Sequence, residues 1–232
     1  MNGFDPTNIA ANYLGDPGLV PHIPFSSFSV SVPANSTVEL VVSEINAGVT
    51  GTPYDVVVTG LCPLEVTTAV SRKTHGAAGE FDIALPLFGQ PGVECRTGGG
   101  NHTLVFAFNS AVISGNAAVT AGIGSAGPPT FLGTTMTVPL SGVTDLQKIA
   151  VSLGGVTNSV GQMLPNTAVS MNLLIADTNG DRTVNSGDAL QTRNRSGQVT
   201  NTTNLRSDVN ADGIVNSGDA LVVRSRSGNF VP

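Results

Sequence analysis

Charged and aromatic residues are scarce in this chain of 232 residues, of which 11% are charged, 5% are aromatic and none is Trp. The net charge of −6 gives no basic surface, so nucleic acid is not an expected partner. No apolar run reaches the roughly 18 residues that a membrane-spanning helix needs. Thr, Ser, Val, Gly and Asn are plentiful, which is typical of an extracellular β-rich protein. No secretory signal pattern opens the chain, so we expect an extracellular or cell-surface protein whose export signal is not part of this sequence.

Cysteine is scarce as well, because the chain contains only Cys62 and Cys95. In a secreted protein these two residues could form one disulfide, closing a loop of about 34 residues and stabilising the fold by about 3–4 kcal/mol. Two buried free thiols are the alternative. We favour the disulfide.

The strongest pattern in most of the chain is that of β-strands. Short runs in which apolar and polar residues alternate, separated by Pro, Gly and Asn, indicate antiparallel sheets. Three such runs between Phe25 and Leu61 predict a partial β-sandwich module over residues 1–66. Six more predict a complete β-sandwich domain over residues 67–176, and their ranges are 80–87, 102–109, 118–123, 135–140, 147–153 and 168–176.

The last predicted domain, residues 177–232, contains one acidic phrase twice: "DTNGDRTVNSGDAL" from Asp177 and "DVNADGIVNSGDAL" from Asp208. Positions 1, 3, 5, 9 and 12 of each copy are Asp or Asn, and position 7 would add a backbone carbonyl. Calcium binds six to eight such oxygens, and this spacing wraps a loop around one ion. The predicted ligands are Asp177, Asn179, Asp181, Thr183, Asn185 and Asp188 in the first loop, and Asp208, Asn210, Asp212, Ile214, Asn216 and Asp219 in the second.

Asx-rich surface turns are the alternative reading of these loops, but agreement at all five side-chain positions in both copies favours two Ca²⁺ ions. No cluster of His and Cys suggests zinc. Residues 186–195 and 217–226 each predict a short helix with Arg near its end and a Gly stop. We expect Val184 and Val215, at position 8 of the two loops, to pair their backbones and hold the loops together.

The repeated phrase resembles a type I dockerin module, in which each EF-hand-like calcium loop precedes a single helix. Asp at position 12, here Asp188 and Asp219, is part of that resemblance, whereas Arg182 stands at position 6, where EF-hand loops prefer Gly. The resemblance implies docking on a cohesin-like partner. "FSVSVPANSTVELVVSEINAG" and "AVSRKTHGAAGEFDIALPLFGQPGVECR" resemble β-sandwich modules of bacterial secreted multidomain proteins. Together they imply a mainly β protein, with antiparallel β-sandwich domains followed by a small α-helical calcium module.

No catalytic constellation is present, and we do not expect an enzyme. None of His22, His75 and His102 stands in a recognisable nucleophile motif. The favoured function is a non-catalytic structural protein that assembles with copies of itself into a surface fibre or scaffold, with calcium rigidifying the C-terminal module. It is favoured because "MNLLIA" meets Asp177 without a flexible linker. The alternatives are a docking module that recruits a cohesin-like domain, and an accessory carbohydrate-binding part of a secreted enzyme.

Overall fold

The computed structural model describes residues 63–232. The three strands predicted between Phe25 and Leu61 lie outside the described residues. The chain divides into two compact units, Met1–Thr59 and Gly60–Pro232, and every described residue belongs to the second. The domain boundaries at residues 66/67 and 176/177 stay predictions.

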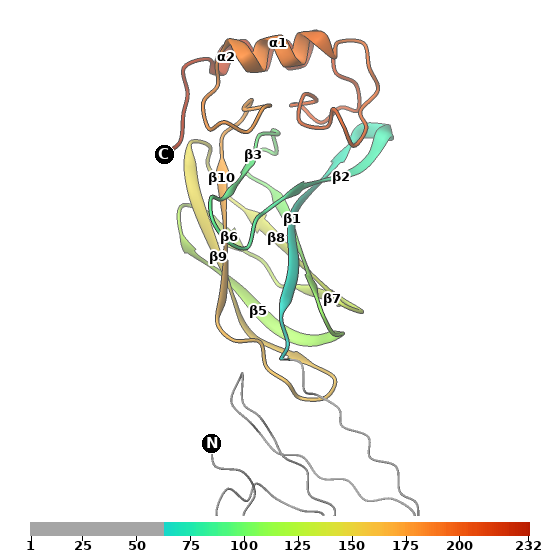
Figure 1. The fold of residues 1–232 in the computed structure, drawn as a ribbon, viewed down its shortest axis with the longest axis vertical. Helices are drawn as coiled ribbons and strands as arrows, with labels where there is room; N and C mark the ends of the chain where they lie inside the picture. The colour runs from blue at the N-terminus through green and yellow to red at the C-terminus, as the bar shows by residue number, and fades with distance from the viewer. Residues whose placement is uncertain (1–62) are drawn as a thin grey trace, which may run out of the picture. The chain divides into compact units, whose positions relative to one another are not determined.

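Residues 63–232 form two β-sheets and two short helices (Figure 1). One sheet has the strand order β2-β1-β4-β8-β6, with β7 also paired to β8, and the other has the order β3-β10-β9-β5. Neighbouring strands are antiparallel except β3 and β10, which are parallel. The predicted mainly β fold with a small helical part at its C-terminal end is confirmed. The elements are β1 Val66–His75, the 3-10 turn Gly76–Ala78, β2 Gly79–Ala84, β3 Gly92–Glu94, β4 His102–Phe108, β5 Val112–Ala121, β6 Ser125–Ala126, β7 Thr130–Leu132, β8 Thr135–Ser141, β9 Gln147–Asn158, β10 Thr167–Leu173, α1 Ser186–Asn194 and α2 Ser217–Arg226.

The main hydrophobic core draws side chains from both sheets. Leu104 and Phe106 of β4 and Met136 and Val138 of β8 are almost completely buried, and they stand two residues apart on their strands. Burying each such side chain is worth roughly 1.5–3 kcal/mol. This period of two is the signal by which the sequence predicts these strands. The other sheet contributes Ile149, Val151, Leu153, Val169 and Met171 to the same core.

Each of the six predicted strand ranges overlaps one strand of the structure, namely β2, β4, β5, β8, β9 and β10. The bounds differ most at β5, which begins at Val112 rather than at residue 118, and at β9, which continues to Asn158 rather than ending at residue 153. Strand β1 was not among the predicted ranges. Its most buried positions include Ala69, Ser71 and His75, which are small or polar and so give no hydrophobic period. Ser71 and His75 take part in a buried polar network instead.

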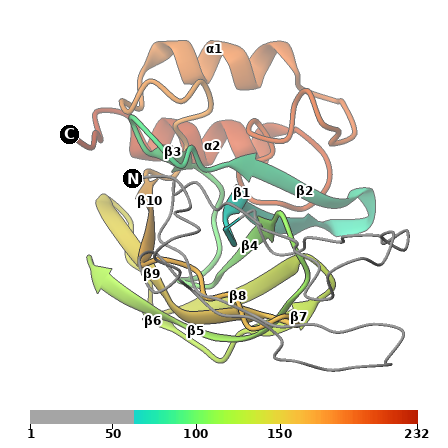
Figure 2. The ribbon, with the colours of Figure 1, turned by 60° about the horizontal axis from the view of Figure 1, so that its bottom comes forward.

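The two helices lie together at one end of the described residues, beyond the strands (Figures 1 and 2). Among residues 63–232, no helix is long and apolar enough to span a membrane. A second, smaller hydrophobic cluster packs beneath the helices. Because it includes Val93 of β3, it attaches the helical part to a sheet. Its members are Val93, Leu174, Ala176, Val184, Val209, Val223 and Val231.

Candidate metal centre

Both predicted calcium loops, residues 177–188 and 208–219, use left-handed backbone at positions 4 and 6. The φ angles are 81° at Gly180 and 71° at Arg182 in the first loop, and 59° at Ala211 and 100° at Gly213 in the second. Glycine adopts this conformation freely, whereas other residues incur about 1–2 kcal/mol. Each loop therefore has one glycine and one strained residue, at exchanged positions. Gly180 compensates only in part for the missing glycine at position 6 of the first loop, because Arg182 still has a left-handed backbone.

This backbone turn directs N–H groups toward the aspartate at position 1. The N–H of Gly180 donates to Oδ1 of Asp177 at 2.8 Å, and the N–H of Arg182 donates to Oδ2 at 2.9 Å. In the second loop, the N–H of Gly213 donates to Oδ2 of Asp208 at 2.9 Å. Both aspartates are fully buried, so each loop closes around its first carboxylate.

The aspartate at position 12 links each loop to the helix that follows. Asn185 is the N-cap of α1, and its backbone N–H donates to Oδ2 of Asp188 at 2.8 Å, which completes a capping box. The N–H of Thr178 donates to Oδ1 of the same carboxylate at 2.7 Å. Asn216 and Asp219 form the equivalent capping box at α2. One side chain thus ties together the start of the loop, its end and the first helical turn.

The middle ligand positions of each loop converge. Asn179 Nδ2 lies 2.9 Å from Oδ2 of Asp181, while Asn185 Nδ2 lies 3.5 Å from the same oxygen and 3.3 Å from the carbonyl oxygen of Thr183. Rotating an Asn amide exchanges Nδ2 for Oδ1 at the same place, so these groups can present oxygen to a cation. The second loop repeats the arrangement, with distances of 2.8, 3.3 and 3.1 Å among Asn210, Asp212, Ile214 and Asn216.

The loops concentrate negative charge in a buried place. Asp177, Asp188, Asp208 and Asp219 are fully buried, and of the loop carboxylates only Asp208 has an ion-pair partner among residues 63–232, namely His75. Burial raises the pKa of Asp177 and of Asp219, and neighbouring carboxylates add to both shifts, although N–H groups of the loops offset part of them. A bound cation would relieve this repulsion.

The chemistry of the donors suits calcium. All the predicted donors are oxygens, the hard ligands that calcium prefers, and none is a nitrogen or sulfur of the kind that selects zinc. Within the described part of the chain, no three or more His, Cys, Asp or Glu side chains are grouped so as to hold a metal ion by themselves. The predicted ligand set of each loop accordingly includes Asn side chains and a backbone carbonyl besides its three carboxylates.

The predicted backbone pairing of Val184 with Val215 is wrong. Val184 instead exchanges hydrogen bonds of 2.8 and 2.9 Å with residues 228–229, which follow α2. Val215 does the same with residues 197–198, which follow α1, at 2.9 and 2.7 Å. The chain leaving each helix turns back past the other loop, so its free backbone groups are the nearest partners. Both valines are nonetheless fully buried.

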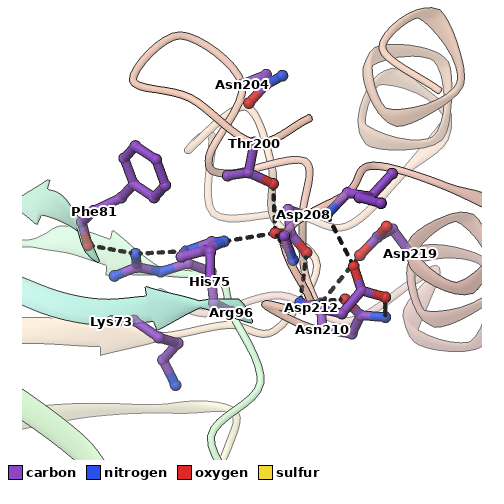
Figure 3. A network of polar contacts seen from close by, with 12 residues as sticks. Lys73, His75, Phe81, Arg96, Thr200, Asn204, Asp208, Asn210, Asp212 and Asp219 are labelled. Atoms are coloured by element: carbon purple, nitrogen blue, oxygen red, sulfur yellow. Dashed lines mark hydrogen bonds and ion pairs between the residues drawn. The ribbon is translucent and has the colours of Figure 1, made fainter. Parts of the chain in front are cut away.

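A buried polar network joins the second loop to β1 (Figure 3). His75, the last residue of β1, places Nδ1 2.7 Å from Oδ2 of Asp208, and both side chains are inaccessible to solvent. Thr200 donates its hydroxyl to the same oxygen at 2.6 Å. Behind the imidazole, Arg96 Nη1 lies 3.1 Å from Nε2 of His75, and the guanidinium binds both carboxylate oxygens of Glu94 at 2.7–2.8 Å.

Both carboxylates of this network are held in the ionised form. Burial alone would raise the pKa of Glu94, but the hydrogen bonds and positive charge of Arg96 lower it to about 2. Burial would also raise the pKa of Asp208, but hydrogen bonds from His75 and Thr200 outweigh burial and hold it below the usual value. The second loop therefore differs electrostatically from the first, whose Asp177 has a raised pKa.

Arg206 attaches the first loop to β3. Its guanidinium donates to three carbonyl oxygens: Nε to Thr178 at 3.0 Å, Nη1 to Val93 at 2.9 Å and Nη2 to Asp177 at 2.8 Å. Arg206 itself lies just before Asp208, so one side chain connects a sheet with both repeats. The sequence predicts no flexible linker here, and these hydrogen bonds tie the first loop directly to a strand.

Cys95, one of the two cysteines of the predicted disulfide, is a buried free thiol in the structure. Its Sγ lies 3.6 Å from the carbonyl oxygen of Arg206, and burial raises its pKa to about 11. Cys62, the predicted partner, lies outside the described residues. The Cys62–Cys95 disulfide therefore stays a prediction.

The two repeats together match a known protein family. Residues 175–226 match the family model of the Dockerin type I domain. The predicted recognition of a C-terminal dockerin-like repeat pair is confirmed. The match covers less than a quarter of the chain, and the region before it is the β-rich part described above. Type I dockerin domains bind calcium, in agreement with the donors of both loops. No curated protein and no solved structure matches the chain.

The sequence did not reveal the residues that support the dockerin repeats from the β-sheets. His75 and Asp208 are 133 positions apart, and Arg206 and Val93 are 113 apart. A single sequence does not show which residues so far apart come into contact. The one weak signal for strand β1 is that Ser71 and His75 stand on the same face of it, as the apolar residues of an ordinary strand do.

Proposed function

We propose that this chain is a non-catalytic extracellular assembly protein whose dockerin repeats bind two Ca²⁺ ions and dock on a cohesin-type partner. The family match and the matching donor sets of the two loops support calcium binding. The proposed role of calcium is to hold each loop closed, so that α1 and α2 are presented in a fixed arrangement. The loop residues that would hold the ions are the twelve predicted ligands.

The observation that carries the docking role is a pair of exposed side chains repeated on the two helices. Leu190 of α1 and Leu221 of α2 occupy equivalent positions and are 56% and 68% exposed. Arg193 and Arg224, three residues further along, are exposed too, and in the described range their side chains make no hydrogen bond or ion pair. An apolar side chain beside a free cation suits an apolar partner surface with an acidic rim.

Binding to a panel of cohesin domains, measured by interferometry in millimolar calcium and then in chelator, tests this function. We expect at least one cohesin to bind in calcium and to dissociate in chelator. Leu190→Ala combined with Leu221→Ala should weaken binding by on the order of ten-fold or more, as loss of central apolar contacts does. Leu132→Ala on β7, where the leucine is 83% exposed, is the matched control and should bind normally. Failure of every cohesin, or binding that ignores calcium, would contradict the proposal.

A second candidate, a rigid subunit of a polymer, is favoured by the junction between the sheets and the repeats. We propose that the two sheets pack as a sandwich, and Arg206 and His75 fasten the dockerin repeats to it. Such a rigid body suits a fibre better than a flexible tether does. Light scattering separates the candidates: assemblies that shrink on chelation would support the polymer, and a monomer in both conditions would leave the docking role.

A further inference from the structure

We propose that His75 is a positioning residue for the second calcium loop, so that the end of β1 completes a site otherwise formed by the dockerin repeat alone. The inference rests on the proposed binding of calcium by this loop. It extends the metal centre beyond residues 175–226, the range that matches the family. Figure 3 shows the imidazole between the guanidinium of Arg96 and the carboxylate of Asp208.

The hydrogen bonds fix which nitrogen of His75 donates. Arg96 Nη1, 3.1 Å from Nε2, can only donate, because a guanidinium has no acceptor. Nε2 is therefore the acceptor, and the hydrogen of the ring lies on Nδ1, which donates to Oδ2 of Asp208 at 2.7 Å. Phe81 contributes its carbonyl to Arg96 Nη1 at 2.8 Å and keeps the guanidinium in place. The imidazole is thus oriented from behind and directed at the carboxylate.

The three donors on one oxygen of Asp208 restrict how its carboxylate can turn. Oδ2 accepts from His75, Thr200 and the N–H of Gly213, at 2.7, 2.6 and 2.9 Å. Among the hydrogen bonds within residues 63–232, Oδ1 accepts only the N–H of Asp212, at 3.1 Å. Oδ1 is therefore the oxygen with free capacity for a cation, while Oδ2 holds the group in place. Groups behind a metal ligand that fix its orientation strongly affect metal affinity.

The first loop lacks this support. Oδ2 of Asp177 accepts the N–H of Arg182, its own loop's backbone, and the hydrogen bonds of the described residues include no side-chain donor to it. The two loops have the same donor residues at positions 1, 3, 5, 9 and 12, so they serve as an internal comparison. Only the second loop should depend on a side chain of β1.

The backbone of the turn after β1 also lies against the second loop. A Cβ atom on Gly76 would overlap the carbonyl oxygen of Asp212, and one on Gly213 would lie 2.9 Å from the carbonyl oxygen of His75. The N–H of Thr97 donates to the carbonyl of Val209 at 2.7 Å. The side-chain contact is therefore part of a continuous interface. By thermodynamic reciprocity, calcium bound in the second loop should stabilise the β1–β2 turn as much as the turn stabilises the bound ion.

Calcium titration calorimetry of the full chain tests the proposal when one loop is disabled at a time. Asp181→Ala removes an exposed ligand of the first loop, so only the second loop titrates; Asp212→Ala does the reverse. In each background we compare His75→Leu with His75→Asn. Leucine and asparagine have nearly the same shape, and the Asn amide nitrogen lies as many bonds from Cα as Nδ1 does. The pair therefore differs mainly in the donor to Asp208.

In the Asp181→Ala background, we expect His75→Leu to weaken calcium binding by on the order of 10-fold to 100-fold, and His75→Asn to restore most of the loss. In the Asp212→Ala background both substitutions should leave the affinity unchanged. Equal affinities for leucine, asparagine and histidine in the second loop would overturn the positioning role while leaving two-ion binding intact. If the second loop binds no calcium with His75 in place, the two-ion proposal fails, and this inference fails with it.

Hydrogen exchange on the Asp181→Ala chain with His75 intact decides the matter if His75→Leu does not fold. Calcium should slow amide exchange in the turn at residues 76–79 together with the second loop. Exchange in the turn that does not respond to calcium, while exchange in the second loop slows, would overturn the proposal.

Discussion

Replacing Arg206 by methionine should detach the dockerin repeats from β3. Methionine retains much of the apolar stem of arginine but none of its donors, so the substitution removes the three hydrogen bonds of 2.8–3.0 Å to the carbonyls of Val93, Asp177 and Thr178. These carbonyls then have to find water instead, and one of them belongs to Val93, a member of the second hydrophobic cluster.

The magnitude follows from the number of bonds and their exposure. A hydrogen bond from a charged donor contributes about 1.5–3 kcal/mol. The three bonds share one side chain and are not additive, and Arg206 is half-buried, so solvent replaces part of the loss. We expect a loss of about 3 kcal/mol, which lowers the melting temperature by about 10 °C in a unit of this size.

Thermal unfolding followed by circular dichroism in saturating calcium measures this loss. Arg193→Met is the matched control, because the side chain of Arg193 is exposed on α1 and makes no hydrogen bond or ion pair with another described residue. Its effect should stay within about 0.5 kcal/mol. Equal melting temperatures for the two variants would refute the conclusion that Arg206 fastens the repeats to the sheet.

Three further predictions concern pH, backbone space and thiol chemistry. Burial, with Lys73 and Arg96 nearby, lowers the pKa of His102 to about 4. Between pH 6.5 and 4 the unfolded chain therefore binds a proton that the folded chain does not, and the free energy of unfolding falls by about 3 kcal/mol as pH drops through that window. Urea denaturation at pH 6.5 and at pH 4 should show this fall, and His102→Gln should remove it. Gly213→Ala, at φ 100° and with a Cβ 2.9 Å from the carbonyl oxygen of His75, should cost about 2–3 kcal/mol in thermal unfolding, whereas Ala211→Gly should cost nothing. Cys95, buried with a pKa of about 11, should react with a thiol reagent at pH 8 only after denaturant is added; rapid labelling of the native protein at this site would contradict its burial.

The predictable parts of this protein are those in which the information is local. The donors of each loop occur within twelve residues, and the caps Asn185 and Asn216 stand directly before the helices they start, so both features are evident in the sequence. The predicted strands with apolar inward faces, such as β4 and β8, are evident for the same reason. Strand β1 is not, because Ser71 and His75 occupy its inward positions.

The unpredicted parts depend on tertiary contacts. Val184 and Val215 are both buried as their apolar character suggests, but which backbone each pairs with depends on the path of the chain after the opposite helix. Arg182 has a left-handed backbone, a conformation that arginine disfavours. The hydrogen bond from its N–H to Asp177 compensates for this cost.

Counting the bound ions by native mass spectrometry tests the central claim most directly. The account predicts two Ca²⁺ ions on the intact chain, none after chelation, and one each for Asp181→Ala and Asp212→Ala at calcium concentrations that saturate the unaltered protein. A chain that binds no calcium, or whose ion count is unchanged by both substitutions, would contradict it.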